Sequence, residues 1–272
     1  MGDNAKRVLF VNSEIYPYLP ESHEAHIGRY LPQGILERKK EIRSFMPRYG
    51  CINERKNQLH EVIRLSGLNI VINDVDRPMV IKVASISAAR MQVYFIDNDD
   101  YFKRKRTYSD EDGVFYADNA ERAVFFARGV LETVKKLRWA PDIIHCHGWI
   151  SHIVPLFLKK AYKDDPIFAS SKVVLSLYND TPDARFSDDF SKIAMYGGVS
   201  AEDVKLLEDP TGINLAKTAA LQSDGIILSD DKVNGEVVSF CEKLSVPMLR
   251  YNGQSMEDGS WIDEYNSFYD QL

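Results

Sequence analysis

The sequence lacks any sustained basic segment, and its acidic residues outnumber its basic ones. The 272 residues include 40 aspartates and glutamates against 34 lysines and arginines, which gives a formal net charge of -6. The one basic cluster, at 103–106, is surrounded by carboxylates and is interpreted as a solvated loop. Proteins that bind nucleic acid use a basic face to neutralise phosphates, so nucleic acid is not expected as a partner.

Cysteines are few, and long apolar runs are absent. Cys51, Cys146 and Cys241 are an odd number of thiols without the spacing of metal ligands, which favours reduced thiols in the cytoplasm over a disulfide framework. The first apolar run lasts only from Val8 to Val11, too short for a signal peptide, and no stretch approaches the length of a membrane span. We therefore expect a cytoplasmic protein with no membrane association, no bound metal and no cofactor.

The composition is that of an ordinary globular domain. Apolar residues make up 44% of the chain and charged residues 27%, enough to bury a large core. No stretch rich in proline, glycine or serine resembles a linker. This predicts a single domain over residues 1–272.

Strand-like and helix-like segments alternate along the chain. Short apolar runs predict strands at 8–11, 41–46, 142–146, 172–177, 225–228 and 247–250. Helical spacing predicts helices at 25–39, with Pro32 in the first turns, at 118–137, after 151, at 214–223, at 231–244 and after 258. Apolar and polar residues nearly alternate between 59 and 97, with turns at 74–78 and 87–90, which predicts antiparallel strands added to the main sheet. The segment 181–209 has no clear pattern. The fold class is α/β: a Rossmann-like, doubly wound, mostly parallel sheet with an antiparallel hairpin insertion.

The segment W-A-P-D-I-I-H-C-H-G-W-I-S-H-I-V-P at 139–155 reads as a strand, a tight turn and a helix. Ligands of open α/β sheets bind beyond the carboxyl ends of the strands, where His147 and Trp149 are placed. His145 and His147 are predicted to point to opposite faces of the strand, with His147 lining a cleft. A metal site is not expected because no fourth ligand is evident. Trp149 is expected to be a packing anchor under the helix more than a platform for a ligand.

The first predicted strand also ends in candidate binding residues, namely Glu14, Tyr16 and Tyr18. Tyrosine rings are amphipathic surfaces that suit a pyranose ring. Tyrosines in a proline-containing loop also often cover a core, and both alternatives stay open. His23 and His26, further along this loop, have no partner that the sequence identifies.

Asp118 and Asn119 precede the long predicted helix. Asp118 is expected to cap this helix, because Glu121 follows three residues later as in a capping box. A binding role for Asp118 and Asn119 is compatible with the cap.

Several segments, in this order, carry a resemblance to a known family. They are V-L-F-V-N-S-E-I-Y-P-Y at 8–18, M-P-R-Y-G at 46–50, F-I-D-N-D-D-Y-F-K-R at 95–104, Y-A-D-N-A-E-R-A-V-F-F-A-R at 116–128, W-A-P-D-I-I-H-C-H-G-W at 139–149 and L-S-L-Y-N at 175–179. The chain resembles the N-terminal half of bacterial glycogen and starch synthases, which are ADP-glucose-dependent glycosyltransferases of the two-lobed GT-B fold. The resemblance implies one lobe of that fold, with Asp118 near a sugar site.

The chain departs from the family at three motifs. The family's first loop has a Lys-Thr-Gly-Gly-Leu motif that holds the nucleotide-sugar phosphates, whereas residues 19–26 contain no lysine and no paired glycines. The two glutamates of this loop would repel a diphosphate. At residues 147–150 the family's His-Asp-Trp-His motif is replaced by His-Gly-Trp-Ile. At residues 176–179 its Thr-Val-His-Asn motif is replaced by Ser-Leu-Tyr-Asn, which retains only Asn179.

The resemblance also implies a second lobe that carries the donor nucleotide, and the chain ends at Leu272 before such a lobe. We therefore expect a glycogen/starch synthase-related domain that is not a competent glucosyltransferase alone and that retains glucan or sugar binding. The candidate binding residues are Glu14, Tyr16, Tyr18, Asp118, Asn119, His147, Trp149 and Asn179. No residue is assigned as catalytic.

Two alternatives stay open. The chain could be the acceptor half of a split ADP-glucose-dependent α-1,4-glucan synthase, completed by a protein partner that supplies the second lobe and the nucleotide-sugar site. It could also be a non-catalytic regulatory or scaffold protein of glycogen metabolism.

Overall fold

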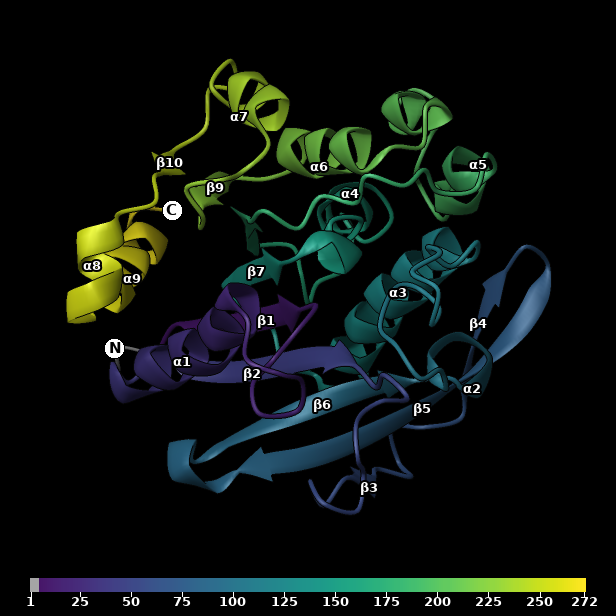
Figure 1. The fold of residues 1–272 in the computed structure, drawn as a ribbon, viewed down its shortest axis with the longest axis horizontal. Helices are drawn as coiled ribbons and strands as arrows, with labels where there is room; N and C mark the ends of the chain where they lie inside the picture. Colours follow the sequence, from purple (N-terminus) through teal and green to yellow (C-terminus); the bar gives the residue numbers. More distant parts are fainter. Residues whose placement is uncertain (1–4) are drawn as a thin grey trace.

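The computed structural model describes residues 5–272 and is built around one mostly parallel sheet (Figure 1). In spatial order, the parallel strands are β10 (Met248–Leu249), β9 (Gly225–Leu228), β8 (Lys172–Leu177), β7 (Ile143–His147), β1 (Arg7–Asn12), β2 (Glu41–Pro47) and β6 (Met91–Asp97). At the far edge β5 (Val75–Ile86) pairs antiparallel with β6, and β3 (His60–Glu61) and β4 (Leu68–Ile72) pair antiparallel with β5.

The central strand β1 is buried on both faces. Val8, Leu9, Phe10 and Val11 are all fully inaccessible to solvent, and β1 lies between β2 and β7. A parallel strand covered by helices on both sides reads as a continuous apolar run, and this is the reason the sequence identifies it.

Helices cover both faces of the sheet (Figure 1). Side chains of α1 (His23–Glu37) and α9 (Trp261–Gln271) form one buried cluster with Val8 and Phe10 of β1, and α8 (Gly253–Asp258) precedes α9. The other face packs mainly against α3 (Asn119–Leu137), α4 (Val154–Lys160), α6 (Gly212–Leu221) and α7 (Gly235–Cys241). The short helices α2 (Asp99–Phe102) and α5 (Phe190–Ala194) complete this layer. This arrangement confirms the predicted α/β class.

Several predicted boundaries are corrected. Pro32 lies in the interior of α1, nine residues beyond His23, and not in the first turns. The predicted turn at 74–78 is only the Asn73–Asp74 pair, whose positive φ angles of 50° and 59° suit these two residue types. Residues 76–78 continue β5 in register with β4.

The insertion and the last third of the chain also differ from the expectation. β6 runs parallel to β2, so it belongs to the main sheet, and only β3, β4 and β5 are antiparallel additions. α7 is shorter than predicted, since the Asn234 side chain caps it by accepting hydrogen bonds from the N–H groups of Glu236 and Val237. The unassigned segment 181–209 contains α5 and one turn of 3-10 helix at Lys205–Glu208.

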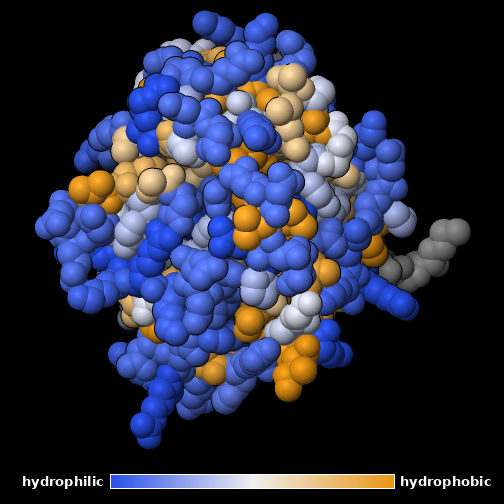
Figure 2. All heavy atoms as spheres, turned by 90° about the vertical axis from the view of Figure 1, so that its right-hand side faces the viewer, coloured by the Kyte–Doolittle hydropathy of each residue, from blue (hydrophilic) through white to orange (hydrophobic). Residues whose placement is uncertain are grey.

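One face, over the β4–β5 hairpin and α5, is mainly hydrophilic with small separate apolar patches (Figure 2). Val71 and Val75 of the hairpin and Met195 after α5 are exposed there. Within residues 5–272, no helix is both long and apolar enough to cross a membrane.

The contact of α1 with the end of β1 depends on a glycine. A Cβ atom added to Gly28 would lie 2.3 Å from the carbonyl oxygen of Glu14. We expect Gly28→Ala to lower the free energy of unfolding by about 1–3 kcal/mol, because the helix must move away from the strand. The measurement is urea unfolding followed by circular dichroism.

Gly235→Ala is the matched control, since a Cβ atom there would meet no atom within 4 Å at the start of another helix. Alanine is the better helix former, so this variant should be neutral or more stable by up to about 1 kcal/mol. Equal effects of the two substitutions would show that the contact at Gly28 does not limit stability.

Candidate ligand-binding cleft at the carboxyl edge of the sheet

A cleft of about 230 Å³ opens beyond the carboxyl ends of β1, β8 and β9, at the start of α1. It is lined by Glu14, Ser22, His23, Glu24, Tyr178, Asn179, Asp180 and Asp230. Parallel strands end at the same edge, so loops far apart in sequence meet at this place. Of the sequence-predicted residues, the cleft brings together Glu14 and Asn179.

Four of the lining residues are carboxylates. Burial raises the pKa of Glu24 well above its usual value, and the neighbouring Asp180 and Glu14 raise it further. Burial also raises the pKa of Glu14, and it raises the pKa of Asp180 to about 6. The cleft therefore gathers four acidic groups, and the raised pKa values of Glu14, Glu24 and Asp180 show that their ionised forms are unfavourable there.

Glu24 occupies the space between the start of α1 and the turn after β7. Ser22 caps α1 by accepting a hydrogen bond from the N–H of Ala25 at 3.0 Å, which places Glu24 in the first turn. A Cβ atom on Gly148 would lie 2.0 Å from Oε1 of Glu24, and Gly148 has a φ of 76°, which favours glycine. Helix N-termini attract anions, and here the protein places its own carboxyl group at that position.

Hydrogen bonds fix the polar groups around Glu24. The Ser22 hydroxyl donates to Glu14 Oε2 at 3.0 Å, and Nε2 of His23 donates to the carbonyl oxygen of Ser229 at 2.6 Å. Oε1 of Glu24 and Oδ1 of Asp180 are buried and have no hydrogen-bond partner among residues 5–272. These two unsatisfied oxygens leave acceptor capacity at the cleft.

The two histidines of β7 point to the same face of the strand, so the prediction of opposite faces was wrong. Residues two apart on a strand lie on one side, and the rings of His145 and His147 are 3.8 Å apart. Both side chains are fully buried, and His147 does not line the cleft. Burial lowers the pKa of His147 to about 3, and it also lowers that of His145, so both rings are neutral at physiological pH.

His145 is the centre of a buried hydrogen-bond network. Its Nδ1 is 2.6 Å from the hydroxyl of Tyr269, and its Nε2 is 2.7 Å from Oγ of Ser176. Ser229 continues the network to Ser176 at 2.9 Å and to the hydroxyl of Tyr265 at 2.8 Å. The network fastens α9 to strands β7 and β8. His147 acts on the cleft indirectly, because its Nδ1 is 2.6 Å from the hydroxyl of the lining residue Tyr178.

The aromatic candidates lie outside the cleft. The Trp149 side chain is only 3% exposed and packs against Tyr108, Phe115 and Phe186, as expected of a packing anchor. Its backbone N–H donates to Oδ2 of Asp180 at 2.6 Å. Tyr18 is buried against Phe95, with ring centroids 4.9 Å apart. Tyr16 is exposed and does not line the cleft.

Asp118 occupies the N-cap position of α3, as predicted, but its side chain makes no capping hydrogen bond, so the predicted capping box is wrong. Its carboxylate instead accepts two hydrogen bonds from the guanidinium of Arg104, one of them at 2.7 Å. Glu121 accepts a hydrogen bond from the Tyr101 hydroxyl at 2.5 Å. The paired, charge-assisted contact with Arg104 is stronger than a hydrogen bond to a backbone N–H, which explains why the Asp118 carboxylate binds the guanidinium and does not cap the helix. Asn119 is fully buried and donates to the carbonyl oxygen of Tyr108 at 2.8 Å, away from the cleft.

No three or more His, Cys, Asp or Glu residues within 5–272 are arranged to hold a metal ion. The three cysteines are free thiols, of which Cys51 is exposed. His23 and His26 lie in α1 and not in the loop before it, and both have partners: Nε2 of His23 bonds to the carbonyl oxygen of Ser229, and Nδ1 of His26 is 3.6 Å from Oε1 of Glu21.

The family model of the starch synthase catalytic domain matches residues 7–245. The chain belongs to this starch synthase family. Glycogen synthases are among its relatives: that of Chlorobium limicola is 39% identical over 174 residues, and that of Chlorobaculum tepidum is 40% identical over the same length. Each match covers 64% of this chain and 36% of the relative, so the chain spans about a third of the length of these relatives.

A solved member of the starch synthase family has the same fold. The catalytic domain of starch synthase IV from Arabidopsis thaliana, bound to ADP and acarbose, superimposes with a TM-score of 0.66 at 16% identity. The match covers 82% of this chain and 44% of that structure. The predicted relation to glycogen and starch synthases, and the predicted GT-B lobe, are thereby confirmed.

Sequence reasoning missed most of the cleft. Asp180 and Asp230 lie in the loops that follow β8 and β9, and the rule that ligands bind beyond strand ends would have found them. His23 and Glu24 were visible only as departures from the family's first loop. Their position at the first turn of α1 depends on where the helix starts, which was predicted two residues too late.

We expect Glu24→Gln to stabilise the fold in a pH-dependent manner. The folded-state pKa of Glu24 is raised, so the wild-type protein loses stability as the pH rises through that value, whereas glutamine carries no charge at any pH. The variant should be more stable at pH 8 by on the order of 1–3 kcal/mol. The gain should vanish below pH 4.5, the usual carboxyl pKa. Thermal and urea unfolding across this range measure it.

Glu21→Gln is the control, because the Glu21 side chain is 66% exposed. Its stability should follow that of the wild-type protein at every pH. A Glu24→Gln variant that is less stable than wild type at pH 8 would contradict the unfavourable burial of this carboxylate.

Proposed function

We propose that this starch synthase-family domain binds the end of a neutral glucan at the carboxyl-edge cleft, and that it is not by itself a competent glucosyltransferase. The observation that carries the proposal is the Glu24 carboxyl group against Gly148, at the N-terminus of α1. An anion-binding position of the fold is thus filled by an acid of the chain itself.

The charges of the cleft argue against a nucleotide diphosphate. The resemblance to glycogen synthases implies a lysine and glycine N–H groups at this loop, and the chain has Glu21 and Glu24 instead. The cleft is lined by four carboxylates and by neither lysine nor arginine. A diphosphate there would meet like charges at short range in a partly buried site, where electrostatic repulsion is strong.

The same groups suit sugar hydroxyls. Ionised carboxylates accept hydrogen bonds, and a carboxyl group with a raised pKa also donates one, so the cleft offers both functions to a polyol. Asn179 is exposed at the rim and adds an amide. The volume of about 230 Å³ lies below the range of about 300–1,000 Å³ that is usual for ligand pockets, which favours a single terminal glucose unit over a longer segment.

Isothermal calorimetry with maltoheptaose, ADP and ADP-glucose at millimolar concentration tests the proposal. We expect heat from maltoheptaose alone. Asn179→Ala should weaken the binding of maltoheptaose by about 3- to 10-fold, the effect of losing one hydrogen bond. Gln254→Ala, an exposed substitution outside the cleft, should leave the affinity unchanged.

Binding of ADP-glucose without binding of maltoheptaose would overturn the proposal. Turnover of ADP-glucose after addition of a protein that supplies a donor lobe would favour the split-synthase alternative. The absence of binding heat with all three ligands would favour the regulatory or scaffold alternative and a protein partner.

A further inference from the structure

The outer side of α1 begins at the carboxyl-edge cleft. Residues 23, 26, 30, 33 and 37 of this helix are exposed or half-buried and follow one another at spacings of three and four, so they form one stripe along the helix. The first three are His23, His26 and Tyr30, and His23 also lines the cleft. A row of three aromatic rings therefore leads from the cleft onto the surface of α1.

The rings of His26 and Tyr30 are neighbours on this stripe. Their centroids are 4.4 Å apart, and the ring planes are inclined at 42°. The guanidinium carbon of Arg29 is 5.2 Å from the centre of the Tyr30 ring, and since Arg29 is itself buried, it supports the ring from the protein side. Tyr30 nevertheless remains 36% exposed. The protein thus orients the Tyr30 ring and leaves it accessible from solvent.

Polar groups and a further ring border this pair. Nδ1 of His26 is 3.6 Å from Oε1 of Glu21, whose side chain is exposed. The backbone N–H of Tyr16 donates to the carbonyl oxygen of Ala25 at 3.1 Å, so the exposed Tyr16 lies beside the first turn of α1. A pyranose has apolar faces and a rim of hydroxyl groups, and aromatic rings bordered by hydrogen-bonding groups complement both features.

The cavities beside the β5–β6 hairpin are larger than the cleft, but they differ in character. One, of about 450 Å³, lies where β6 parts from β2, and its lining includes Arg43 and Arg90. The other, of about 600 Å³, lies on the β3 side of the hairpin, and its lining includes Lys56. Neither cavity is lined by aspartate or glutamate, and these three basic residues form no ion pair within residues 5–272.

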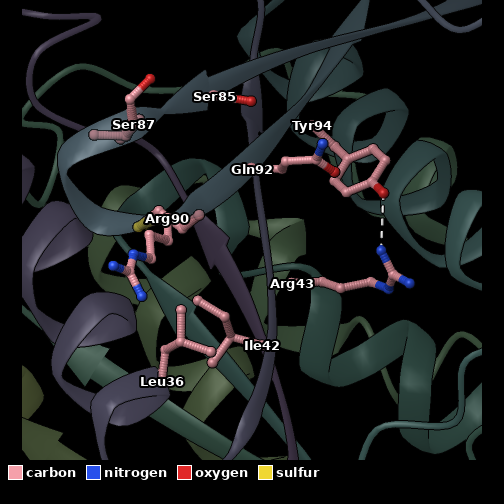
Figure 3. A pocket seen from close by; sticks show the side chains of 10 residues that line it. Leu36, Ile42, Arg43, Ser85, Ser87, Arg90, Gln92 and Tyr94 are labelled. Atoms are coloured by element: carbon pink, nitrogen blue, oxygen red, sulfur yellow. Dashed lines mark hydrogen bonds between the residues drawn. The ribbon is translucent and has the colours of Figure 1, made fainter.

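The tyrosines of these cavities do not offer a ring face to a sugar. Tyr18 and Tyr94 are both buried, and the Tyr94 hydroxyl accepts a hydrogen bond from Nη1 of Arg43 at 2.8 Å (Figure 3). The Tyr94 ring also stacks on Phe45, with centroids 5.0 Å apart. Exposed, supported rings that continue from the cleft are found on α1 instead.

We propose that His26 and Tyr30 hold the second and third glucose units of a glucan whose terminal unit occupies the carboxyl-edge cleft, an assignment that rests on the proposed function. The cleft of about 230 Å³ takes a single unit, so the rest of the chain lies on the surface outside it. His26 and Tyr30 are about one helical turn apart, roughly 5.4 Å along the axis. This spacing is comparable with that of neighbouring glucose units, so successive rings meet successive units.

Calorimetry of the full chain with maltose, maltotriose and maltoheptaose tests this assignment. We expect the affinity to rise by about 3- to 10-fold from maltose to maltotriose, the effect of one more stacked ring, and to change little beyond it. Tyr30→Ala should weaken maltotriose and maltoheptaose by the same factor and leave maltose unchanged. Tyr30→Phe, which keeps the ring, should bind all three sugars like the wild-type protein.

Leu221→Ala is the matched control, because Leu221 is an exposed apolar side chain at the end of another helix, α6. It should not alter any of the three affinities. Equal affinities for maltose and maltoheptaose, or full affinity of Tyr30→Ala for maltoheptaose, would overturn the role of the α1 rings and leave the cleft proposal standing.

The opposite result separates the two proposals from the other side. A loss of affinity in Tyr30→Ala without any loss in Asn179→Ala would retain the α1 rings and remove the cleft. If none of the three sugars binds, both proposals are wrong.

Discussion

The close approach of α1 to the central strands sets the geometry of the carboxyl-edge cleft. Gly28 lets the helix lie directly on the carbonyl of Glu14, and Gly148 lets the turn after β7 meet the Glu24 carboxyl group. With side chains at either glycine, the helix would stand further from the sheet and the cleft would widen. The electrostatic character of the cleft follows from this contact, because it is the contact that buries Glu24 beside Asp180 and Glu14.

The cleft and the cavities beside the β5–β6 hairpin have linings of opposite charge, at two edges of one sheet. Acidic residues gather where the parallel strands end, and unpaired basic residues gather where β2 and the hairpin begin to part. Membership of the starch synthase family accounts for the strands and helices that carry both regions. It does not account for the acids in the first loop, which have to be explained from the residues of this chain alone.

The sequence predicted the strands well and the site only in part. β1, β8 and β9 were found because a strand buried on both faces is a continuous apolar run. The interactions of Asp118 could not be found, since they depend on Arg104, which folding brings beside it from a separate loop. Glu14 and Asn179 were identified from strand ends, whereas Glu24 depended on the start of α1. The error on His145 and His147 was one of geometry, because a spacing of two places both rings on one face.

The network around His145 has a consequence for how the chain folds during synthesis. Tyr269 of α9 bonds to His145 of β7, and Tyr265 bonds to Ser229, the residue after β9. Lys6, in the first described residues, donates to the carbonyl oxygen of Tyr269. Val8 and Phe10 share their buried cluster with Trp261 and Phe268. One face of the central strand is therefore covered only in part, by α1, while the ribosome adds some 250 further residues, and the emergence of α9 completes the cover. The nascent chain would carry its central apolar strand half-shielded through nearly all of translation, a natural point for a chaperone to engage.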